Sequence, residues 1–183
     1  MLERGEQVKD VVLADLFDAF MTIKRTNQKA AMTLRRYASL VKLYLQPAFG
    51  SLKAKELRPL DLTRVYSNWL EHGRDGNKVS PRTVRHAHEL FRNILRWGVR
   101  KELLTRNVAA LIEDDDLPKV VEPKPLALTN DELRKVLAEA KNPSSRSKKR
   151  GYMSAQPWFH PAVTFAAYTG CRRGETLEVA PLS

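Results

Sequence analysis

The chain has 183 residues, 43% of them hydrophobic and 29% charged, which is enough apolar side chain for a real core in one or two domains. No apolar run approaches the roughly 20 residues of a membrane span, no signal peptide opens the sequence, and a single cysteine excludes an internal disulfide. The formal net charge is +11, with an isoelectric point near 9.9. We therefore expect a cytoplasmic protein that makes no membrane contact and has a polyanion as partner.

The positive charge is concentrated in the first part of the chain. Residues 1–111 hold 21 Lys and Arg against 11 Asp and Glu, whereas residues 112–183 hold 11 against 10. Between Ala19 and Lys55 there are eight basic residues and no acidic one. Such an uneven block favours nucleic acid as the partner, the alternative being a basic surface that serves only solubility.

Apolar residues at helical spacing predict a first helix over about residues 8–25. Its apolar face comprises Val12, Leu16, Ala19, Phe20 and Ile23. A second helix is predicted over about residues 29–46, ending before Pro47 because proline disfavours a helical residue in front of it. Its apolar stripe comprises Ala31, Leu34, Ala38, Val41 and Leu45. Arg35 and Lys42 lie away from that stripe.

A third helix is predicted over about residues 58–72, beginning at Pro59. It packs through Leu62, Val65, Tyr66 and Trp69. The fourth helix begins with Ser80 as N-cap and Pro81 at the first helical position. Its apolar face comprises Val84, Ala87, Phe91, Ile94, Leu95 and Gly98.

The opposite face of the fourth helix is basic and is interrupted only by Glu89. It carries Arg82, Arg85, Arg92, Arg96 and Arg100. A solvated helical face normally mixes charges of both signs, so this face favours contact with phosphate. His86 and His88 have no third ligand at a metal-like spacing, and we interpret them as surface or packing residues.

The middle of the chain differs in composition from the basic helices before it. Residues 113–125 combine acidic residues with three prolines, which predicts an extended, solvated linker. Thr129 and Glu132 have the spacing of a capping box that opens a helix to about Ala140. An apolar helix is predicted over about residues 158–168.

The sequence Thr169-Gly170-Cys171-Arg172-Arg173-Gly174-Glu175 follows that apolar helix. It predicts a glycine turn and a second helix whose first turn carries Arg172. A guanidinium there adds its donors to a partly positive helix end, which suits a phosphate. The alternative is a capped turn with surface arginines.

The pattern Thr-Gly-x-Arg-x-Gly-Glu resembles the first active-site arginine box of the tyrosine recombinases, or phage integrases. Further matches precede it in the family's order. They are Thr33-x-x-x-Tyr37, Phe49-Gly50 with Leu52, Ser80-x-x-Thr83, Trp97-Gly98-Val99, Asn107-Val108, and Pro125-Leu126-Ala127-Leu128-Thr129-x-x-Glu132. The resemblance extends over nearly the whole chain.

The resemblance implies a mainly α fold with a SAM-like core-binding domain of four to five helices over residues 1–111. A linker over residues 112–128 and the incomplete, helical start of a catalytic domain over residues 129–183 would follow. The family clamps duplex DNA and recombines it through a phosphotyrosyl intermediate, without metal or cofactor, as a homo-oligomer on DNA. Arg172 would hold the phosphate oxygens and Glu175 would support nearby helix or guanidinium groups.

The expected DNA contacts combine the two basic helices: Arg35, Arg36, Lys42, Arg82, Arg85, Arg92 and Arg96. The family's lysine, His-x-x-Arg box and nucleophilic tyrosine follow its first arginine, but no Lys, His, Arg or Tyr follows Glu175 here. We therefore expect a truncated, catalytically incomplete polypeptide. The alternative is a complete helical DNA-binding protein with a regulatory or architectural role. A helical adaptor without DNA would leave the arginine face unexplained.

Overall fold

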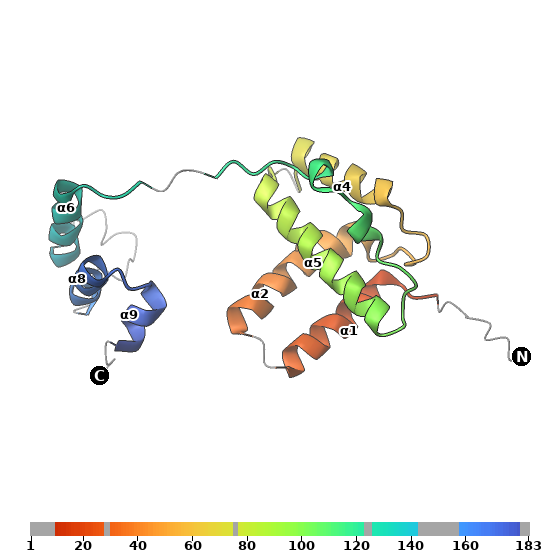
Figure 1. Cartoon of the computed structure of the whole chain (residues 1–183), viewed down its shortest axis with the longest axis horizontal. Helices are drawn as coiled ribbons and strands as arrows, with labels where there is room; N and C mark the ends of the chain where they lie inside the picture. The colour runs from red at the N-terminus through yellow and green to blue at the C-terminus, as the bar shows by residue number, and fades with distance from the viewer. Residues whose placement is uncertain (1–9, 28–29, 75–76, 123–125, 143–157, 180–183) are drawn as a thin grey trace, which may run out of the picture. The chain divides into compact units, whose positions relative to one another are not determined.

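The computed structural model describes residues 10–27, 30–74, 77–122, 126–142 and 158–179 (Figure 1). The chain is mainly α, as predicted. Within these ranges strand-like pairing is limited to two isolated bridges, Val12 with Lys53 and Arg74 with Asn77. No helix in the described part of the chain is long and apolar enough to cross a membrane.

The chain divides into two compact units, Met1–Glu122 and Pro123–Ser183, which we describe separately. The helices of the first unit are α1 (Leu13–Thr26), α2 (Ala31–Leu40), the π-helical η1 (Val41–Leu45), α3 (Gln46–Phe49), α4 (Pro59–Glu71) and α5 (Pro81–Arg100). Two 3-10 turns follow, η2 (Val108–Leu111) and η3 (Asp114–Asp116). The second unit contains α6 (Asn130–Lys141), α8 (Phe159–Thr169) and α9 (Arg173–Val179).

Helix α5 is the centre of the first unit. The apolar residues predicted to face the core are all buried, from Val84 to Gly98. The ring of Phe91 stacks on Phe49 with centroids 5.0 Å apart and meets Phe17 edge-on at 5.8 Å. A Cβ on Gly98 would lie 2.9 Å from the Leu104 side chain, so any larger residue there would force that side chain to shift.

Helix α1 differs from its prediction in register. It begins at Leu13, because Val12 pairs with Lys53 instead of entering the helix. Ala19 is exposed and Ile23 is 37% exposed. The buried residues are Leu13, Leu16, Phe17, Phe20 and Met21. This orientation buries the large Phe17 side chain in place of Ala19, which removes more apolar surface from water.

The second predicted helix does not end before Pro47. It continues through the π-helical η1 and through α3 as far as Phe49. Pro47 has no N–H to donate to the carbonyl of Leu43, four residues earlier. Nη1 of Arg74 donates to that carbonyl at 2.8 Å, which compensates for the missing donor. Of the predicted stripe, Ala31 is exposed, whereas Val41 and Leu45 are buried.

Helix α4 matches its prediction, with Leu62, Tyr66 and Trp69 buried. Tyr66 connects it to α5, because its hydroxyl lies 3.2 Å from Nδ1 of His88. His88 is only 2% exposed, so it is a packing residue. Burial, with smaller effects from the charges of Arg92 and Arg85, lowers the pKa of His88 to about 4.

This lowered pKa makes the first unit less stable in acid. Between pH 6.5 and about 4 the unfolded chain binds a proton at His88 that the folded chain does not, so stability falls as the pH falls. The full shift corresponds to about 3 kcal/mol. We expect His88→Gln to reduce the loss of unfolding free energy measured by urea titration across this pH range. The control is His72→Gln, at an exposed site, which should lose as much unfolding free energy over this pH range as the unmodified protein. An equal pH dependence of the unfolding free energy in the two variants would contradict this account.

Candidate nucleic-acid interface

The outward face of α5 carries arginines from Arg82 to Arg100, with Glu89 as its one acidic residue. The side chains of Arg82, Arg92, Arg96 and Arg100 are exposed, and Arg85 is half-buried. Ser80 fixes the start of the helix, since its Oγ accepts from the Thr83 N–H at 3.2 Å. At about 100° per residue, these arginines lie opposite the buried face. Because the apolar face of α5 is buried in the core, its arginines lie at the protein surface.

Helix α2 packs beside α5 and adds cationic charge to it. Arg36 is exposed and close enough to His86 on α5 to lower its pKa, a shift caused mainly by burial. Arg82 lowers the same pKa and Glu89 raises it. The structure thus brings Arg36, Arg82 and His86 together.

The other two predicted contacts of this region are less well placed. Arg35 and Lys42 are both exposed. Within the described residues neither makes a hydrogen bond or ion pair with α5. Arg36 makes no such bond either; it differs from these two only through its effect on the pKa of His86, and Arg35 and Lys42 stay predicted contacts.

The acidic segment after η2 packs against α5, which the sequence analysis missed. We call residues 113–122 the acidic strap. Ile112 just before it is buried, and Leu117 within it packs against the core. These two apolar residues were the signal in the sequence that the segment is not a fully solvated linker. Figure 1 shows the chain after α5 turning back along this helix.

The strap forms ion pairs with two of the predicted DNA contacts. Nη1 of Arg85 lies 2.7 Å from Oδ1 of Asp114, and Nη2 lies 3.1 Å from Oδ2. Nη2 of Arg82 lies 3.1 Å from Oε1 of Glu122. A recess of about 560 Å³ between α5 and the strap is lined by residues of both charges, Lys119 and Glu89 among them.

The predicted glycine turn is present in the second unit. Gly170 ends α8 with a φ of 70°, a left-handed conformation that glycine adopts without strain. Oε2 of Glu175 accepts from the backbone N–H of Arg172 at 2.8 Å, and the guanidinium lies 3.7 Å from Oε1. Glu175 therefore holds the start of α9. The side chain of Arg172 is 90% exposed.

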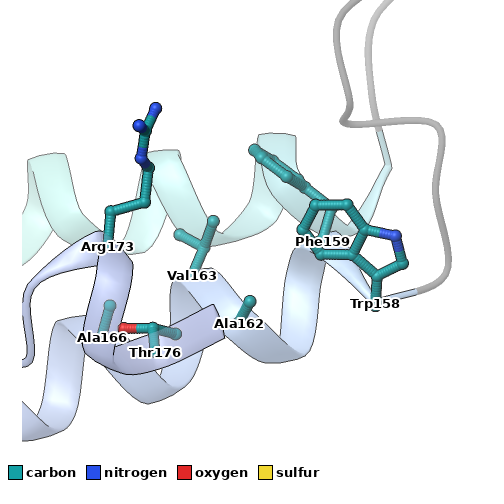
Figure 2. A pocket seen from close by; sticks show the side chains of 7 residues that line it. All are labelled: Trp158, Phe159, Ala162, Val163, Ala166, Arg173 and Thr176. Atoms are coloured by element: carbon teal, nitrogen blue, oxygen red, sulfur yellow. The ribbon is translucent and has the colours of Figure 1, made fainter. Parts of the chain in front are cut away.

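An apolar groove of about 520 Å³ lies between α8 and α9 (Figure 2). The rings of Trp158 and Phe159 lie at one end of it and Arg173 at the other. Ala166 lines the groove, and Phe165 is 39% exposed. The apolar helix was predicted from the sequence, but the groove that Trp158 and Arg173 line was not.

The described residues contain no group of three or more His, Cys, Asp or Glu side chains that could hold a metal ion. No family model matches the chain, and no curated protein matches it. A solution NMR structure of a fragment, residues 61–160, of a protein from Clostridium leptum is similar to it, with 16% identity and a TM-score of 0.48. That match covers 63% of this chain and 95% of the fragment. A likeness this weak bears on neither the fold family nor the function.

The cluster of Arg36, Arg82 and His86 can be tested through the titration of the imidazole. Removing the charge of Arg36 removes one of the causes that lower the pKa of His86. We expect Arg36→Gln to raise this pKa, measured by NMR titration of the ring resonances. Arg35→Gln makes the same change of charge at the neighbouring position and should leave it nearly unchanged. Identical shifts in the two variants would contradict the proximity of Arg36 to α5.

Proposed function

We propose that the first unit binds duplex DNA through the outward face of α5, with Arg36 of α2 at its edge. The observation that carries this proposal is the row of Arg92, Arg96 and Arg100. These side chains are exposed, and within the described residues none has an acidic partner. They recur at four-residue intervals, which places them about 6 Å apart along the helix axis.

Guanidinium groups suit this task because their forked donors bind phosphate oxygens in pairs. A row that serves only solubility would be expected to pair with neighbouring acids on the same helix. Glu89 is the one acidic residue on this face of α5. Lys or Arg contacts with phosphate release counterions, so such binding weakens steeply as salt rises.

We further propose that the chain is the DNA-binding portion of a site-specific tyrosine recombinase. The support is the resemblance of its motifs, in the family's order, together with the turn that presents Arg172. In that reaction Arg172 would donate to the non-bridging oxygens of the scissile phosphate. Glu175 would act by holding the backbone of Arg172, as its 2.8 Å hydrogen bond suggests.

Neutralising the unpaired part of the face tests the DNA-binding proposal. We expect the double variant Arg92→Gln, Arg96→Gln to weaken duplex binding. Its plot of log K against log salt should flatten by roughly two units, since each phosphate contact contributes about 0.9. The measurement is a fluorescence anisotropy titration of a labelled duplex at several salt concentrations.

The matched control removes two positive charges elsewhere in the first unit, at Lys55 and Arg64. The Lys55→Gln, Arg64→Gln variant should keep the salt slope of the unmodified protein. An equal flattening in both variants would show that net charge alone, and not the α5 face, determines binding. An unchanged slope in the Arg92 and Arg96 variant would show that this face is not in contact with DNA.

A further inference from the structure

We infer that the acidic strap, residues 113–122, competes with DNA phosphate for Arg82 and Arg85. This inference rests on the proposed function, because it concerns the same face of α5. The strap covers the N-terminal part of that face. The arginines of its C-terminal part, from Arg92 onward, have no acidic partner among the described residues.

The contact at Arg85 has the geometry of an anion-binding site. Both terminal nitrogens of the guanidinium meet the two carboxylate oxygens of Asp114, at 2.7 and 3.1 Å. Its Nε donates to the carbonyl of Pro118 at 2.8 Å, which orients the fork. A phosphate would offer two oxygens to the same fork, so Asp114 occupies the position that a phosphate needs.

A second contact, made by a single hydrogen bond, lies near the start of α5. Arg82 lies three residues before Arg85, about one turn away, and pairs with Glu122 at 3.1 Å. Both carboxylates come from one segment, so the strap neutralises two neighbouring arginines of the face. Two negative charges held at this surface also repel the phosphates of an approaching duplex.

The two arginines can exchange their carboxylate partners for phosphate without unfolding of the first unit. The side chains of Asp114 and Glu122 are 81% and 76% exposed, so water and salt weaken both pairs. The strap is held independently of them, through Ile112 and Leu117. Phosphate can therefore replace the carboxylates while the apolar anchors remain in place.

The test compares two adjacent aspartates in the full chain. Asp114→Asn removes the carboxylate that pairs with Arg85, and Asp115→Asn removes the same charge from a residue without a partner among the described ones. We expect Asp114→Asn to bind a labelled duplex about two- to fivefold more tightly than Asp115→Asn at low salt. Glu122→Gln should likewise bind the duplex more tightly than Glu71→Gln does. Glu122 lies outside the η3 turn, so this second comparison does not change that turn.

The outcomes separate this inference from the proposed function. Suppose that the unmodified protein binds duplex, but Asp114→Asn binds no more tightly than Asp115→Asn, and Glu122→Gln no more tightly than Glu71→Gln. The strap then does not compete, and the proposed function stands. If neither the unmodified protein nor any variant binds duplex, the proposed function fails and the inference fails with it. Binding that appears or tightens only in Asp114→Asn and Glu122→Gln supports both.

Discussion

The first unit depends on the burial of one face of α5. Phe91 packs between Phe49 and Phe17, and Val84, Ile94 and Leu95 continue the same buried surface. Full burial of such side chains contributes about 1.5–3 kcal/mol each. A rotation of α5 about its axis would expose them and bury guanidinium groups, which is costly. The position of the arginines at the surface is therefore a consequence of the core.

The surface that results has two parts with different electrostatics. Arg82 and Arg85 form ion pairs with carboxylates of the strap, whereas Arg92 and Arg96 have no acidic partner among the described residues. Such a division follows from the path of the chain, which turns after α5 and returns beside it. The side chain of Asn107 marks this path, donating to the carbonyl of Arg92 at 3.0 Å. The arginines of α5 therefore differ in their surroundings: Arg82 and Arg85 have acidic partners, and Arg92 and Arg96 have none among the described residues.

The sequence predicted those features that depend on neighbouring residues. The amphipathic α5, its Ser80 cap and the Thr129 capping box are local, and the structure has all of them. It did not predict the register of α1, because that register depends on contacts with distant residues, such as the packing of Phe17 against Phe91 of α5. The passage of a helix through Pro47 depends on Arg74, far away in the sequence. The strap was missed for the same reason, since its partners lie some 30 to 40 residues earlier.

The central claim is that duplex DNA contacts the outward face of α5. Chemical-shift mapping of the isotopically labelled protein with an unlabelled duplex tests it most directly. We predict that the largest changes fall on the side-chain Nε–H groups of Arg92 and Arg96 and on the resonances of Arg36 and His86. Arg64 on α4 should be nearly unaffected. Changes concentrated on α4, or confined to α6, α8 and α9, would contradict the account.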